Sequence, residues 1–267
     1  MKPAPFRYEA ARSLSGALEL LAGDQDARAL AGGQSLVPML NFRLAWPELI
    51  VDLNPLAELA HLDASGGDLR IGALTRQATL QRSDVVAAGW PLLIQAVAHV
   101  GHAAIRTRGT VGGSVAHADP AAELPVALTA LDARFHLRSR DGARSLSAGE
   151  LFQGALTTAL EPGELLVEIE VPASPPAART AFLEHARTHG DFAVAGVAVI
   201  LAPGEHAAIA LLGADAVPVR AAAAEQALLN GAGPGEAARL AAAGIADDYR
   251  RALLTTLSER ALDQVMA

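Results

Sequence analysis

The stretch Ala31-Gly32-Gly33-Gln34-Ser35-Leu36 lies between an apolar strand predicted over 27–31 and a helix predicted over 35–42. Glycines let a backbone approach a ligand within hydrogen-bonding distance, and the start of a helix presents free N–H groups. This strand–turn–helix order is typical of an anion site that suits phosphate. It also fits a tight turn where two chain segments cross, and the stretch by itself leaves both interpretations open.

A second small-residue stretch, Gly109-Thr110-Val111-Gly112-Gly113-Ser114-Val115-Ala116-His117-Ala118-Asp119, is expected to be a loop. It carries hydroxyls at Thr110 and Ser114, which can donate to phosphate oxygens. Two such stretches from different subdomains would hold a diphosphate from both sides without lysine, and Lys2 is the only lysine in the chain. Neither stretch is a P-loop, since no Gly-Lys-Ser/Thr occurs, nor a G-x-G-x-x-G dinucleotide fingerprint.

Composition excludes several classes of function. Of 267 residues, 51% are hydrophobic and 19% charged, which is enough apolar material for a packed core. The net charge of -8 argues against a nucleic-acid partner. The absence of cysteine excludes thiolate zinc sites and iron–sulfur clusters held within this chain. The N-terminus does not read as a signal peptide and the longest apolar run is 192–203, so we expect a cytoplasmic protein that does not span a membrane.

Hydrophobic periodicity predicts an α+β chain with a domain boundary near residue 173, where prolines cluster at 172–176. The predicted domains are 1–172, with subdomains of about 1–55 and 56–172, and 173–267. Helices are predicted over 13–22, 35–42, 91–100, 221–229 and 248–266, and strands over 27–31, 48–53, 69–73, 134–138, 165–171, 192–201 and 207–212.

Several motifs, spread over the chain in a fixed order, carry a family resemblance. They are Ala31 to Met39 followed by Arg43-Leu44 and Pro47-Glu48-Leu49-Ile50-Val51-Asp52; Ile105-Arg106-x-Arg108-Gly109 to Ser114, continued by Ala118 to Pro125; Arg187-x-x-Gly190-Asp191-Phe192-Ala193; and Asp248 to Leu253. In this order they resemble the flavin subunits of the xanthine dehydrogenase and carbon monoxide dehydrogenase family of molybdenum hydroxylases.

The resemblance implies a two-subdomain FAD-binding domain, followed by a small C-terminal α+β domain with an antiparallel sheet. It places the FAD diphosphate between the two glycine stretches, and an acid that bonds ribose or ribityl hydroxyls at Glu123. Val100 would pack near the adenine or the ring. Leu165 or Leu166 and the Asp191-Phe192 turn would approach the isoalloxazine. His117 would hydrogen-bond FAD or a neighbouring subunit, with turn packing as the alternative. The diphosphate and ribityl contacts would be Ala29, Leu30, Ala31, Gly32, Gly33, Gln34, Ser35, Leu36, Thr110, Val111, Gly112, Gly113 and Ser114.

One position departs from the family pattern. Many members carry a lysine shortly before the Arg-x-x-Gly-Asp stretch, near the flavin, whereas Phe182-Leu183-Glu184-His185 contains none. This difference predicts that the flavin is tuned differently from that of the lysine-bearing relatives.

Other polar pairs give weaker signals. His99-x-x-His102 and His185-x-x-x-His189 have ligand-like spacings, but Gly101 and Gly190 interrupt both segments, so we expect no metal site. Asp119 and Glu123 fit the first turn of a helix starting at Pro120 better than a hydrolase carboxylate pair. No catalytic residue is predicted.

The resemblance therefore predicts an electron relay. A large subunit carrying the molybdenum cofactor would oxidise substrate, and a small subunit with [2Fe–2S] clusters would pass electrons to FAD in this chain, in a dimer of heterotrimers. Two alternatives stay open: a stand-alone FAD-dependent oxidoreductase and a scaffold that has lost its flavin. The substrate and the terminal acceptor are not readable from this sequence.

Overall fold

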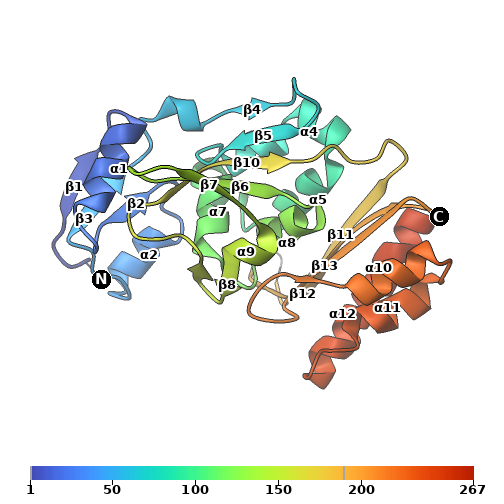
Figure 1. The fold of residues 1–267 in the computed structure, drawn as a ribbon. Coiled ribbons are helices and arrows are strands. Elements are labelled where there is room, and N and C mark those ends of the chain that lie inside the picture. The colour runs from blue at the N-terminus through green and yellow to red at the C-terminus, as the bar shows by residue number, and fades with distance from the viewer. Residues whose placement is uncertain (1, 189) are drawn as a thin grey trace.

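The computed structural model describes residues 2–188 and 190–267, which run from the blue to the red end of the ribbon in Figure 1. The first subdomain is a parallel sheet of three strands in the order β1-β3-β2, with short helices and a 3-10 turn (η1) around it. Its elements are β1 (Arg7–Ala10), α1 (Leu14–Ala22), β2 (Arg28–Leu30), α2 (Leu36–Asn41), β3 (Leu49–Asp52) and η1 (Ala57–Leu59).

Helix α1 forms where the local sequence provides an N-cap and an apolar face. The Ser13 hydroxyl accepts a hydrogen bond of 3.1 Å from the Gly16 N–H, which caps the helix start. Ala17, Leu18 and Leu21 recur at helical spacing and are buried against β3 and its neighbours. The helix predicted over 13–22 is therefore confirmed.

The second subdomain is an antiparallel sheet of five strands in the order β4-β5-β10-β6-β7, with helices packed on one face. Ile71, Phe135, Leu137 and Ile169 project from that face into the main core. The elements are β4 (Leu62–Asp63), β5 (Leu69–Gly72), α3 (Gln77–Gln81), α4 (Asp84–Gly89), α5 (Pro91–His99), α6 (Ala103–Arg108), α7 (Val111–His117), α8 (Glu123–Ala130), β6 (Arg134–Arg138), β7 (Ala143–Ser147), α9 (Ala148–Leu151), β8 (Phe152–Gly154), β9 (Thr157–Thr158) and β10 (Leu165–Val171).

The prediction of a loop over 109–119 was wrong, because most of that stretch is helix α7. Thr110 caps it, its hydroxyl accepting a 3.0 Å hydrogen bond from the Gly113 N–H. Two glycines lower helix propensity, but they let the helix pack closely on β5's end. A Cβ on Gly112 would stand 2.6 Å from the Ala73 Cβ. Tertiary packing thus decides a segment whose local propensity favours a loop.

The C-terminal part is an antiparallel sheet of four strands in the order β11-β12-β13-β14. One face packs on α10 and α12, which α11 joins from outside, and the other face packs on α5 and α8 of the second subdomain, so the sheet is buried on both sides (Figure 1). The elements are β11 (Arg179–Ala186), β12 (Ala193–Ala202), β13 (His206–Leu212), β14 (Val219–Arg220), α10 (Ala222–Leu229), α11 (Pro234–Ala242) and α12 (Asp248–Met266).

The α+β fold class is confirmed, with every predicted strand present within two residues of its expected bounds. Seven strands in the described part of the chain escaped prediction. Each residue of β1 is exposed, β7 and β11 lack clean alternation, and β4, β8, β9 and β14 are only two or three residues long. The boundary near residue 173 stays a prediction. Among the described residues, no helix is both long and apolar enough to cross a membrane.

Candidate functional site

A cavity of about 680 Å³ opens between the two N-terminal subdomains and reaches the start of β12. Its volume lies within the range of about 300–1,000 Å³ that is usual for ligand sites. Most of the residues singled out in the sequence line it, whereas Leu30 and Val111 do not. The lining members are Ala29, Ala31, Gly32, Gly33, Gln34, Ser35, Leu36, Val100, Thr110, Gly112, Gly113, Ser114, His117, Glu123, Leu165, Leu166, Asp191 and Phe192.

The two glycine stretches touch one another at one wall of this cavity. A Cβ on Gly32 would stand 2.4 Å from the carbonyl oxygen of Arg108, so only glycine fits against the second stretch at that point. A Cβ on Gly113 would stand 3.9 Å from the Ala31 Cβ, which is ordinary contact. Gly33 has φ +75°, a conformation that glycine adopts without strain. The turn between β2 and α2 therefore lies directly on the entrance to α7.

Hydroxyl groups of both stretches are available to a ligand. The Ser35 side chain does not cap α2, and neither it nor the Ser114 side chain is hydrogen-bonded within the described part of the chain. The backbone N–H groups of the first stretch, at 32–35, donate no hydrogen bond within the described part of the chain. In the first turn of α7, by contrast, the N–H groups of Val111, Gly112 and Gly113 are already bonded, to the Thr75 carbonyl, the Ala73 carbonyl and the Thr110 hydroxyl. The Ser35 and Ser114 hydroxyls and the N–H groups of the first stretch therefore form a wall of small donors suited to phosphate oxygens.

Glu123 is one of the acidic residues that line the cavity, together with Asp119, Glu164 and Asp191. It is the first residue of α8, is 7% exposed, and its carboxylate is held by no other side chain among the described residues. Burial raises the pKa of Glu123 to about 7, and the carboxylates of Glu184 and Asp119 add to the rise, while its own backbone N–H and His99 oppose it. Helix α8 begins at Glu123 rather than at Pro120, because Asp119 accepts a hydrogen bond from the Ala121 N–H and closes a turn first.

The position that lacks the family lysine holds a partly buried ion pair instead, since the Glu184 side chain is buried and the His99 side chain is 35% exposed. Glu184 on β11 is 6% exposed at its side chain, and its Oε1 lies 3.2 Å from Nδ1 of His99 on α5. The hydrogen bond to Glu184 raises the pKa of His99. The second carboxylate oxygen of Glu184 is buried without a hydrogen-bond partner within the described residues. This pair joins the second subdomain to the C-terminal sheet.

The Asp191-Phe192 turn also lines the cavity. Phe192 is 72% exposed at its rim, whereas Leu165 and Leu166 are buried in its wall. Gly190 has φ +83°, and a Cβ there would stand 2.6 Å from Cε1 of His102. His189, from the second histidine pair considered above, lies outside the described residues.

Sequence reasoning missed other lining residues, such as Ala73, Gln77 and Glu164, because they belong to segments without any ligand-binding pattern. The buried Oε1 of Gln77 has no hydrogen-bond partner within the described residues. A separate surface group, His136, Glu168 and Glu170, has the spacing of a metal site. Its carboxylates are already bonded to Arg70 and histidines, and it lies outside the cavity.

Comparison with known proteins identifies the family. Residues 4–174 match the model of the FAD-binding domain in molybdopterin dehydrogenase. The chain is 45% identical over 236 residues to the alpha subunit of the 6-hydroxypseudooxynicotine dehydrogenase complex of Paenarthrobacter nicotinovorans, a match that covers 86% of this chain and 80% of the relative. The chain belongs to this family. It is an FAD-binding oxidoreductase subunit of the molybdenum hydroxylase type, which confirms the predicted family and cofactor.

Carbon monoxide dehydrogenases are similar to the chain both in sequence and in structure. The carbon monoxide dehydrogenase medium chain of Afipia carboxidovorans is 40% identical over 202 residues, covering 75% of this chain and 70% of the relative. A chain of carbon monoxide dehydrogenase from Hydrogenophaga pseudoflava superimposes with a TM-score of 0.94 at 37% identity, over 100% of this chain and 99% of that one.

Proposed function

We propose that this flavin subunit holds FAD in the cavity with the diphosphate between the two glycine stretches. The observation that carries the proposal is the contact of Gly32 with the Arg108 carbonyl, which sets both stretches along one wall of the cavity. Backbone N–H groups of the first stretch and the hydroxyls of Ser35, Thr110 and Ser114 would bind the phosphate oxygens. Neutral donors are what this wall offers, because no lysine is among the described residues that line the cavity.

The remaining contacts are assigned by position along the cavity. The free carboxylate of Glu123 would accept hydrogen bonds from ribose or ribityl hydroxyls, as charge-assisted bonds of this kind are strong. Val100 would pack near the adenine or the ring, and Leu165, Leu166 and the Asp191-Phe192 turn would approach the isoalloxazine. His117 lines the wall formed by α7 and would bond either FAD or a neighbouring subunit.

We further propose that the chain relays electrons and does not oxidise substrate itself. FAD supplies the capacity to exchange electrons singly and in pairs, while the protein binds it, tunes it and excludes side reactions. Because the chain has no cysteine, the iron–sulfur clusters that feed the flavin would belong to a small partner subunit. A large molybdenum subunit would oxidise the substrate, in a cytoplasmic dimer of heterotrimers.

The relay is tested by purifying the tagged chain from its native cells and analysing what accompanies it. We expect one assembly that contains FAD, molybdenum and iron. Within it, an oxidisable substrate bleaches the flavin absorption, whereas the isolated FAD-loaded chain turns over none. Turnover of a small organic substrate by the isolated chain would instead support a stand-alone oxidoreductase. A chain that cannot be loaded with FAD would support a flavin-free scaffold.

A further inference from the structure

The two glycine stretches belong to different subdomains, so no single element fixes the distance between them. Asn54 lies just beyond β3 and holds the first stretch in place. Its side-chain amide Nδ2 donates a hydrogen bond of 2.8 Å to the carbonyl oxygen of Ala31, at the start of the glycine turn. This bond ties the glycine turn to the strand at the centre of the first sheet.

Arg76 holds the start of the second stretch in place. Its guanidinium NH1 donates a hydrogen bond to the carbonyl oxygen of Arg108, immediately before Gly109. The backbone on either side of Arg76 is paired with the same segment, since the Gln77 N–H bonds the Gly109 carbonyl at 2.9 Å and the Val111 N–H bonds the Thr75 carbonyl at 2.9 Å. The start of α3 therefore moves together with the entrance to α7.

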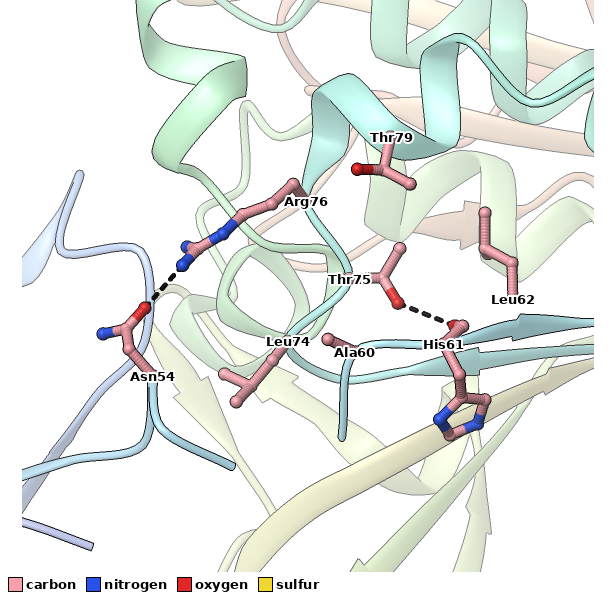
Figure 2. Close-up of a pocket in the computed structure, with 8 residues that line it drawn as sticks. All are labelled: Asn54, Ala60, His61, Leu62, Leu74, Thr75, Arg76 and Thr79. Atoms are coloured by element: carbon pink, nitrogen blue, oxygen red, sulfur yellow. Dashed lines mark hydrogen bonds between the residues drawn. The ribbon is translucent and has the colours of Figure 1, made fainter. Parts of the chain in front are cut away.

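A single side-chain contact joins these two supports. The other guanidinium nitrogen of Arg76, NH2, donates a hydrogen bond of 2.6 Å to Oδ1 of Asn54. Figure 2 shows Arg76 reaching from the start of its helix across to Asn54 on the neighbouring segment. Three hydrogen bonds therefore link Ala31 to Asn54, Asn54 to Arg76 and Arg76 to Arg108. This chain of bonds connects one glycine stretch to the other.

The Asn54 amide is itself held in place. Its backbone N–H donates a hydrogen bond of 3.0 Å to Oδ1 of Asp52, and its Nδ2 also donates to that oxygen. The Tyr8 hydroxyl donates to the other carboxylate oxygen of Asp52 at 2.5 Å. These bonds leave Oδ1 of Asn54 pointing at Arg76. Restrained partners lose less entropy on pairing, which favours a defined spacing.

We propose that Arg76 and Asn54 form a positioning pair that sets the separation of the two glycine stretches, and through it the affinity for the FAD diphosphate. This inference rests on the proposed FAD site. Neither residue is among the described residues that line the large cavity; both line a smaller cavity of about 160 Å³ outside it. The pair therefore acts through the backbone of the stretches and does not touch the cofactor.

The experiment measures the dissociation constants of FAD and of FMN for the full chain by flavin fluorescence. FMN lacks the diphosphate bridge, so a pair that spaces the two stretches matters more for FAD. Arg76→Ala and Asn54→Ala are each expected to weaken FAD binding about tenfold or more and FMN binding much less. The double variant is expected to be no weaker than the worse single one, because either change alone breaks the link. Arg82→Ala is the control, since Arg82 is exposed at the opposite end of α3.

Unfolding curves of the FAD-free variants separate positioning from folding. If Arg76→Ala does not fold, Arg76→Lys tests the same point, because lysine keeps the charge but not the two-pronged geometry. Equal weakening of FAD and FMN binding, or additive effects in the double variant, would overturn the proposal. FAD affinities of the variants within twofold of the unaltered chain would do so as well. Failure of the unaltered chain to bind FAD would instead overturn the proposed site, and the two failures are therefore distinguishable.

Discussion

The carbonyl oxygen of Arg108 faces Gly32 so closely that a Cβ on the glycine would stand 2.4 Å from it. The contact joins segments that are far apart in the sequence and lie on different subdomains. It shows why a glycine is required there independently of any ligand: the backbone of the second stretch occupies the space of a side chain. Any larger residue must push the two stretches apart.

Replacement of this glycine tests the contact. Gly32→Ala is expected to cost about 1–3 kcal/mol of unfolding free energy through overpacking, and to weaken FAD binding by about tenfold or more because the stretches separate. Denaturant unfolding and FAD titration measure the two effects. Gly66→Ala is the matched control, because a Cβ there meets nothing within 4 Å. Equal behaviour of the two variants would contradict the close contact.

The cap of α7 gives a second prediction. Thr110→Val removes the hydroxyl that accepts from the Gly113 N–H and keeps the shape of the side chain. The loss of an N-cap is expected to lower the unfolding free energy by about 1 kcal/mol, measured by urea unfolding. Thr107→Val serves as control, since the Thr107 hydroxyl is exposed and bonds only a carbonyl of its own helix. The prediction fails if both valine variants are equally stable.

Glu123 makes the stability of the FAD-free chain depend on pH. Because its pKa is raised in the folded state to about 7, the folded chain keeps a proton that the unfolded chain releases near the ordinary value of 4.5. Its stabilising contribution is complete below that ordinary value and is lost as pH rises through about 7. The full change is at most about 3 kcal/mol, at about 1.36 kcal/mol per pH unit.

Glu123→Gln removes that titration. The variant is expected to gain stability over the unaltered chain at pH 8 but not at pH 4, because glutamine resembles the protonated acid and cannot ionise. Urea unfolding of the FAD-free proteins across this range measures the difference. A constant difference at all pH values would mean that Glu123 does not titrate in the folded chain with a raised pKa.

The partly buried pair of His99 and Glu184 predicts a shifted histidine titration. Since Glu184 raises the pKa of His99, the pair stabilises the fold fully below the ordinary histidine pKa, and this contribution is lost as pH rises through the higher folded value. An NMR titration of the His99 ring is expected to show a midpoint that falls in Glu184→Gln. The other histidines serve as internal controls. If the His99 midpoint does not move in the variant, the pairing of His99 on α5 with Glu184 on β11 is contradicted.

The sequence predicted the first glycine turn because its signals are local: a strand, two glycines and a helix start within a dozen residues. The second stretch was predicted as a contact region but not as helix α7, because its helical conformation depends on packing against Ala73. Glu123 was singled out through the family motif, while its pKa is raised mainly by burial and further by Glu184, and both depend on packing between segments distant in sequence.

Arg76 and Asn54 had no recognisable signal as a pair. Each is a common polar residue beside a secondary-structure element, and 22 residues separate them. The only local hint is the Asp52-x-Asn54 spacing after a strand, which is typical of a side-chain turn. Long-range polar pairs of this kind arise from the packing of whole subdomains, so a single sequence does not reveal them.

The central claim is that this chain holds one FAD in the cavity between its two glycine stretches. Titration of the purified, FAD-free chain with FAD, followed by flavin fluorescence, tests it most directly when the unaltered chain and Gly32→Ala are compared. We predict saturable binding of one FAD per chain, and weaker binding by about tenfold or more in the variant. A chain that takes up no FAD, or a variant that binds it as tightly as the unaltered protein, would contradict the account.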